Sequence, residues 1–192
     1  LYFLFSCVKF LYSMFINQKI TKFIILFFCF SIFSSISQTS EDVPLNNIAI
    51  YEIPKPISSL IFEDFSGNKV NLNEYNKKLV ILNFWATWCA PCKKEMPSLD
   101  KIYQSDRFKN LEVFAVNMEE PNKEKTRSFF NDLNIEKLSI FFDPKLNFVK
   151  KFKLKGVPTT IIINKKGEEF ARIIGEVNFM DKKFLNWLAK YD

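Results

Sequence analysis

The sequence predicts an α/β protein in which a central mixed β-sheet is flanked by helices. Three observations support this fold class. Strand-like and helix-like patterns alternate through most of the chain. An apolar run typical of a buried strand, Val80–Trp85, leads into two cysteines spaced three apart, Cys89 and Cys92. A hairpin pattern and an amphipathic helix close the chain. With 192 residues and 48% hydrophobic content, the chain can form one domain plus an appendage.

Residues 1–37 are predicted to be a leader. The run Phe23–Phe33 is apolar and free of charge, Lys19 and Lys22 precede it, and mostly small residues follow at positions 34–37. This order of basic, apolar and small residues is typical of a signal peptide. The apolar run is short for a membrane span, which needs about 20 residues. An uncleaved leader would still act as an N-terminal anchor in the inner membrane.

The predicted location follows from the leader. Basic residues before the apolar run favour a cytoplasmic N-terminus, which places the domain outside the cytoplasm, in the periplasm. A compact leader begins at Met14, so we interpret residues 1–13 as lying upstream of the true start. The alternative is a hydrophobic hairpin that crosses the membrane twice through residues 1–36.

A linker and then the folded domain are expected after the leader. Residues 38–56 are polar with three prolines and little periodicity, and the domain is assigned to residues 57–192. Its first element is a β-hairpin between residues 57 and 72 that turns at Ser66–Asn68. The helix after the cysteines, Lys93–Tyr103, carries apolar residues at helical spacing.

The remaining elements follow from the same patterns. Runs of β-branched and aromatic residues predict strands, and apolar residues three or four apart predict helices. The last helix carries one apolar stripe: Met180, Phe184, Trp187 and Leu188. Strands are expected at 112–117, 138–142, 161–163 and 170–174, and helices at 121–134, 146–152 and 178–190. A turn at 164–167 joins the last two strands.

Composition excludes several kinds of site. The chain has no histidine, which removes His-based metal sites, Cys-His nucleophile pairs, Ser-His-Asp triads and covalent c-type haem attachment. Cys7 and Cys29 lie in the leader, so the domain has two thiols, too few for a four-ligand zinc site or a disulfide scaffold. The net charge of +6 falls to +3 without the leader's three lysines, which does not indicate nucleic-acid binding. No metal or cofactor is expected.

A Cys-x-x-Cys pair at a strand-to-helix junction is typical of a dithiol that exchanges disulfides. The amides and dipole at the helix start stabilise a thiolate at Cys89, and the thiolate is the reactive form. We expect Cys89 to be the exposed nucleophile that forms a mixed disulfide. Cys92, one turn further in and more buried, then resolves that intermediate.

Two motifs carry a family resemblance. The segment Asn83–Pro97, the Gly-Val-Pro-Thr-Thr run at 156–160 and the extra segment between them resemble the TlpA/ResA-like thiol-disulfide reductases of the thioredoxin superfamily. The resemblance extends from Ile57 to the C-terminus. It implies a thioredoxin-like fold with an N-terminal β-hairpin extension and a central αβ insertion.

The resemblance also implies roles for residues around the cysteines. It implies that Pro158 is cis and packs against the cysteine pair. The backbone of Val157 is then free to pair with an extended substrate segment. We expect Trp88 to line the substrate face, although packing alone would explain it.

One departure from the cytoplasmic thioredoxins concerns proton transfer. Those proteins have a buried aspartate where this chain has Asn83, which cannot titrate. The family's candidate proton carrier is instead Glu95, which we predict to deprotonate Cys92 during resolution. The alternative is that Glu95 is a solvated carboxylate in the first turn of the helix, stabilised by the helix dipole.

These inferences predict an extracytoplasmic thiol-disulfide oxidoreductase that reduces disulfides in client proteins. The resemblance implies a membrane electron donor of the DsbD/CcdA type and clients in cytochrome c maturation or copper-site assembly. The alternatives are an oxidase or isomerase with the same fold, and a non-catalytic adaptor or Cu(I)-binding module that uses the two thiols. A peroxidase is disfavoured because no Pro-x-x-x-Thr-x-x-Cys pattern is found.

Overall fold

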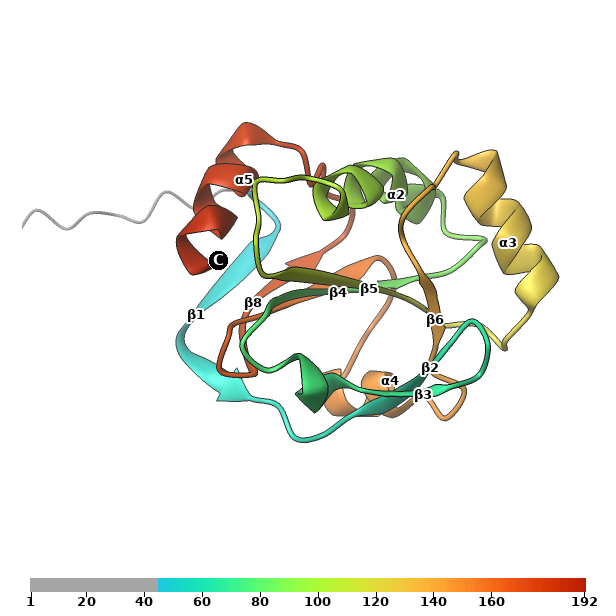
Figure 1. Ribbon diagram of the computed structural model, residues 1–192, viewed down its shortest axis with the longest axis horizontal. Helices are drawn as coiled ribbons and strands as arrows, with labels where there is room; N and C mark the ends of the chain where they lie inside the picture. Colours follow the sequence, from blue (N-terminus) through green and yellow to red (C-terminus); the bar gives the residue numbers. More distant parts are fainter. Residues whose placement is uncertain (1–44) are drawn as a thin grey trace, which may run out of the picture. The chain divides into compact units, whose positions relative to one another are not determined.

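The computed structural model describes residues 45–192, which form a mixed eight-stranded sheet with helices on both faces (Figure 1). The predicted leader and its Met14 start lie outside the described residues. The strand order is β1-β8-β7-β4-β5-β6-β2-β3. β4, β5 and β6 run parallel, and the other neighbouring pairs are antiparallel. The strands are β1 (Ile48–Pro56), β2 (Ile61–Asp64), β3 (Lys69–Asn71), β4 (Leu79–Trp85), β5 (Leu111–Asn117), β6 (Ile140–Phe142), β7 (Thr159–Ile163) and β8 (Glu168–Ile174).

The predicted fold class is confirmed, because a mixed sheet carries helices on both of its faces. Three helices, α2 (Ala90–Tyr103), α3 (Lys123–Asp132) and α5 (Lys182–Leu188), lie on one face, and α4 (Asn147–Phe152) lies on the other (Figure 1). All seven residues of β4 are buried, as expected of a central strand covered on both sides. Short 3₁₀ turns, η1 (Leu72–Tyr75) and η2 (Ala189–Tyr191), complete the elements.

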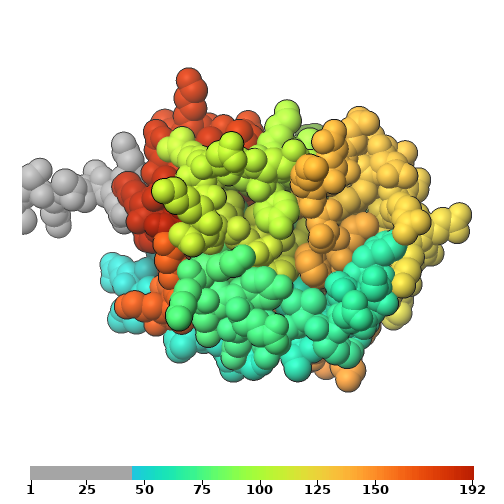
Figure 2. Space-filling view, in the orientation of Figure 1, coloured from blue at the N-terminus to red at the C-terminus, as the bar shows by residue number. Residues whose placement is uncertain are grey.

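The face under α4 is packed largely with aromatic rings. Phe62 of β2 lies 5.2 to 5.4 Å, between ring centroids, from Phe114, Phe141 and Phe148. The expected hairpin is present as β2 and β3, and it joins the sheet through pairing of β2 with β6. In the space-filling view, this hairpin and the segment after it form the lower surface of the domain (Figure 2).

The assignment of residues 38–56 to a linker requires a correction. Residues 48–56 form β1, an edge strand paired with β8, and only residues 38–44 fall outside the described part of the chain. Pro54 and Pro56 obscured this strand in the sequence. An edge strand tolerates proline, and the pairing shifts register between Ile50 and Lys55. Just before the strand, the Asn47 side-chain amide donates to the carbonyls of Ile174 and Glu176.

The C-terminal helix is shorter than predicted. Asp181 is the N-cap residue, because its side chain accepts hydrogen bonds from the amides of Lys183 and Phe184. The helix α5 therefore begins at Lys182 rather than near Asn178. Met180 therefore precedes the helix and is partly exposed, whereas Phe184, Trp187 and Leu188 are buried as expected. None of the helices in residues 45–192 has the length and apolar character needed to cross a bilayer.

Candidate active site

The two cysteines form a disulfide at the point where β4 leads into α2. Cys89 is the N-cap residue of α2, and its Sγ accepts a hydrogen bond from the amide of Cys92 at 3.2 Å. Pro91 lies in the first turn, where a missing amide hydrogen has no consequence for the helix. The helix start thus directs an amide donor at the Cys89 sulfur, as required to stabilise a thiolate there.

The expectation of an exposed Cys89 is wrong for this disulfide state. Cys89 is 3% exposed and Cys92 is fully buried. The Cys89 sulfur is bonded to the buried Cys92 sulfur and accepts the hydrogen bond of the Cys92 amide, which accounts for its low exposure. Cys89 is still the more accessible of the two. Trp88, the preceding residue in the chain, is 71% exposed.

Glu95 lies one turn beyond Cys92 on α2 and is 2% exposed. The two residues are three apart and therefore occupy the same side of the helix. Glu95 Oε1 accepts a hydrogen bond from Asn83 Nδ2 at 2.7 Å, and Oε2 accepts one from the amide of Val177 at 3.1 Å. The alternative of a solvated carboxylate is therefore wrong, because Glu95 is inside the protein.

Burial raises the pKa of Glu95 to about 7. The hydrogen bonds from Asn83 and Val177 favour the ionised form and lower the pKa, while the charge of Glu176 raises it further. The net result is a carboxyl group that changes its protonation state near neutral pH. A group with such a pKa can both accept and release a proton in that range.

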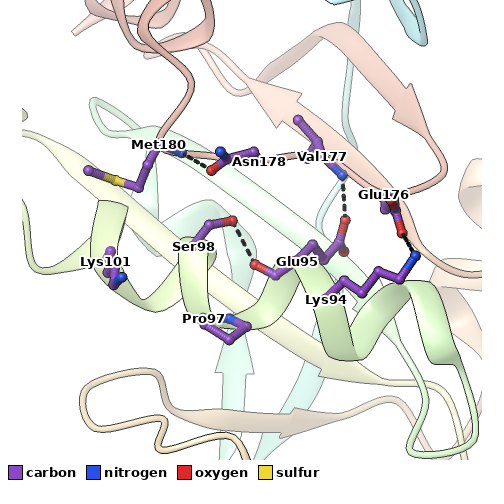
Figure 3. A pocket seen from close by; sticks show the side chains of 9 residues that line it. All are labelled: Lys94, Glu95, Pro97, Ser98, Lys101, Glu176, Val177, Asn178 and Met180. Atoms are coloured by element: carbon purple, nitrogen blue, oxygen red, sulfur yellow. Dashed lines mark hydrogen bonds and ion pairs between the residues drawn. The ribbon is translucent and has the colours of Figure 1, made fainter.

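A cavity of about 510 Å³ opens beside Glu95 between α2 and the segment after β8. Figure 3 shows Glu95 reaching from α2 toward Val177, with Ser98 one turn further along the helix. Lys94 forms an ion pair with Glu176 at 3.5 Å at the edge of this cavity. The cavity brings solvent close to a carboxyl group that is itself almost fully buried.

Pro158 is in the cis form, as the resemblance implied. Its carbonyl accepts a hydrogen bond from the amide of Gly175 at 2.9 Å, and Gly175 has a φ of +91°, which favours glycine. Thr159 pairs with Phe84, so Pro158 lies at the same end of β4 as the cysteines. Within residues 45–192, neither backbone polar group of Val157 has a hydrogen-bond partner. Both are therefore available to a substrate backbone.

The loop before the cysteines is held by a second carboxylate. Glu119 accepts hydrogen bonds from the Thr87 amide at 2.5 Å, the Thr87 hydroxyl at 3.0 Å and Lys125 Nζ at 2.7 Å. Burial opposes ionisation of Glu119, but the bonds from Lys125 and Thr87 outweigh it and hold the pKa below its ordinary value. Trp88 lines a shallow groove with Lys93 next to this loop.

The sequence did not reveal which groups would surround Glu95. Asn83 lies directly opposite Thr160 in the β4–β7 pairing, and its Nδ2 donates to the Thr160 hydroxyl at 3.0 Å as well as to Glu95. A buried asparagine inside an otherwise apolar strand requires a hydrogen-bond partner, so the sequence did indicate that a polar side chain lies near Asn83. The partner proved to be the predicted proton carrier. The backbone amide of Val177 could not be inferred, because it depends on the loop after β8.

Comparison with known proteins identifies the family. The AhpC/TSA family pattern matches residues 53–168, which is more than half of the chain. The chain belongs to this family. A thiol-disulfide oxidoreductase ResA of Bacillus thuringiensis is 31% identical over 125 residues, covering 65% of this chain and 71% of that protein. The chain therefore also belongs with the ResA-like thiol-disulfide oxidoreductases, and the resemblance drawn from its motifs is confirmed.

Two further proteins are similar to this chain, one in sequence and one in fold. ResA of Halalkalibacterium halodurans is 38% identical over 110 residues, which cover 57% of this chain and 61% of that protein. The chain thus matches less than two thirds of that relative. A secreted thiol-disulfide isomerase from Corynebacterium glutamicum superposes with a TM-score of 0.64 at 22% identity, covering 79% of this chain and 95% of that one. This last likeness shows the fold alone, and it confirms the thioredoxin-like architecture.

Proposed function

We propose that the protein reduces disulfides in client proteins outside the cytoplasm. The observation that carries the proposal is the arrangement of three groups on α2. The Cys89 sulfur accepts a hydrogen bond from a helix amide, and Cys92, one turn further along, is buried. One turn beyond Cys92 lies the buried carboxyl group of Glu95, whose pKa is near neutrality. Nucleophile, resolving thiol and proton acceptor thus lie in series on one helix.

The reaction balances as a dithiol–disulfide exchange. The Cys89 thiolate attacks a client sulfur, the client disulfide breaks, and a Cys89–client disulfide forms while the second client sulfur leaves as a thiolate. Glu95 takes the proton of Cys92, whose thiolate then attacks Cys89 and releases the reduced client. The disulfide form described here is the product of that cycle. The cavity beside Glu95 provides the route by which its proton exchanges with solvent.

Client binding is assigned to the surface around the disulfide. Trp88, next to Cys89 in the chain, is exposed, and the backbone of Val157 beside cis-Pro158, which has no partner within residues 45–192, can accept an extended client strand. The leader pattern in residues 1–37 supports a location outside the cytoplasm, where protein disulfides occur. A membrane electron donor of the DsbD/CcdA type would restore the dithiol. Apocytochrome c or copper-site assembly factors are the client classes that we propose.

The decisive experiment is client trapping with a Cys92→Ala variant. Because resolution is blocked, mixed disulfides at Cys89 should accumulate and be visible as reducible adducts by mass spectrometry. A Cys89→Ser variant serves as the control and should trap nothing. If Cys92→Ala gives no adducts, or if insulin reduction survives Cys89→Ser, the protein acts as an adaptor or Cu(I)-binding module instead.

The direction of electron flow has its own measurement. Equilibration with glutathione should give a potential nearer to the roughly −270 mV of thioredoxin than to the roughly −180 mV of disulfide isomerase. A value of about −200 mV or higher would favour the oxidase or isomerase alternative.

A further inference from the structure

A groove beside cis-Pro158 suggests which clients the protein prefers. The groove has a volume of about 560 Å³ and lies on the α4 side of β8 and β1. On this face, α4 and η1 cover the middle of the sheet over β4 and β7. Toward the β8–β1 edge the sheet surface remains open, and Ile174 at the end of β8 is 67% exposed.

The groove is continuous with the proposed client-binding backbone. Its wall includes Val157 and Pro158, and from there it extends past Ile174 to Tyr51 of β1. Thr159 pairs with Ile174, so this end of β8 lies at the same end of the sheet as the cysteines. A client strand that pairs with Val157 would therefore place its neighbouring residues over the groove.

The charges that line the groove all have one sign. Among residues 45–192 they are Lys153, Lys155 and Arg172, and no carboxylate of this part of the chain belongs to the lining. Arg172 is already paired with Glu169 at 2.8 Å. Lys153 and Lys155 are exposed, and within residues 45–192 neither forms an ion pair. Two exposed lysines that form no ion pair in the described part of the chain therefore border an open apolar surface next to the redox site.

We propose that this groove binds an extended client segment that carries acidic side chains next to its reactive cysteine. This inference rests on the proposed function and specifies its substrate class. The client's apolar atoms cover Ile174, and its carboxylates pair with Lys153 and Lys155. Opposite charges at such a site accelerate encounter and reject clients that carry basic residues in the same place.

The test uses the full-length Cys92→Ala protein and synthetic peptides. Each peptide has one cysteine, activated as a mixed disulfide with thionitrobenzoate, flanked by two Glu, two Gln or two Lys. The Cys89 thiolate attacks the peptide sulfur, the peptide–thionitrobenzoate bond breaks, and yellow thionitrobenzoate leaves as a thiolate. At low salt, we expect the Glu peptide to react about tenfold faster than the Lys peptide.

A pair of charge reversals distinguishes the groove from the net charge of the protein. Lys153→Glu with Lys155→Glu should abolish or reverse the preference. The matched control is Lys109→Glu with Lys137→Glu, two exposed lysines that precede β5 and β6 at the opposite end of the sheet. This control changes the net charge equally and should retain the preference.

Each outcome decides a different question. If the three peptides react equally, or if both double variants lose the preference alike, the groove does not select acidic clients, while the proposed disulfide exchange stands. If no peptide forms an adduct, including the neutral Gln peptide, then the proposed function itself is wrong.

Discussion

Two carboxylates flank the redox disulfide, and their surroundings differ in a way that separates their roles. Glu95 is almost fully buried and receives two hydrogen bonds, from Asn83 and the Val177 amide, and its pKa rises to about 7. Glu119 is less buried and is bound by Lys125 and by both polar groups of Thr87, and its pKa falls. Protonation is therefore decided by the balance between burial and donors. At Glu95 deep burial outweighs two neutral donors, whereas at Glu119 weaker burial is outweighed by a cation and the two donors of Thr87.

The largest effect on activity should come from replacing Glu95, the carboxylate of the two that titrates near neutral pH. Glu95→Gln keeps the shape of the side chain but cannot accept a proton from Cys92. We expect insulin reduction at neutral pH to slow by about 10²-fold, and its rate to lose the inflection near pH 7. The measurement is the pH–rate profile from pH 5 to 9. A variant that retains an inflection near pH 7 would show that another group carries the proton.

The same substitution should change how stability depends on pH. The ordinary pKa of Glu95 is 4.5 and the folded value is about 7, so between these values the folded protein holds a proton that the unfolded chain releases. The free energy of unfolding therefore falls as pH rises through this window, by about 3 kcal/mol in total, and then levels off.

Urea unfolding of the disulfide form at several pH values checks this slope. The comparison is between the wild type and Glu95→Gln, because all other titrating groups are common to both. Glutamine offers one acceptor where the glutamate offers two, so below about pH 4.5 the variant should be less stable than the wild type by about 1 kcal/mol. This deficit should shrink and then reverse as pH rises through 7, because only the wild type loses stability in that window. Parallel curves for the two proteins would contradict the assignment of the raised pKa to Glu95.

The smallest effect on stability should come from Glu119→Gln. This change removes the charge that pairs with Lys125, which is a partly exposed ion pair and contributes about 1 kcal/mol or less. The lowered pKa of Glu119 means that its stabilisation is present above its ordinary pKa and is lost as pH falls through the folded value. Thermal unfolding at pH 7 and pH 3.5 should therefore differ less in the variant than in the wild type. The inflection near pH 7 in the rate profile should stay, and its loss would mean that the two carboxylates are coupled.

Much of this site could be predicted from local sequence patterns. Patterns along the chain predict the strand Val80–Trp85 and the helix after the cysteines, because apolar runs and helical spacing are local properties. The cis form of Pro158 follows from the family resemblance and is present in the structure. What could not be predicted depends on tertiary neighbours. The burial of Glu95 follows from the loop around Val177, which is 82 residues away in the chain. The edge strand β1 escaped detection because its prolines imitate a linker and its partner, β8, lies more than 100 residues further on.

The hydrogen bonds of Asn47 bear on how far the protein can be shortened. Its side chain holds the carbonyls of Ile174 and Glu176, on either side of Gly175, and the next residue is Val177, which donates to the proton carrier. Proteolytic trimming that stops before residue 47 keeps both hydrogen bonds of the Asn47 side chain. Trimming to Ile48 would keep every strand of the sheet and yet remove both side-chain bonds of Asn47 from the segment that positions Glu95, leaving the Gly175–Pro158 and Phe179–Ser98 bonds. The residue just before the first strand is therefore part of the support of the redox site.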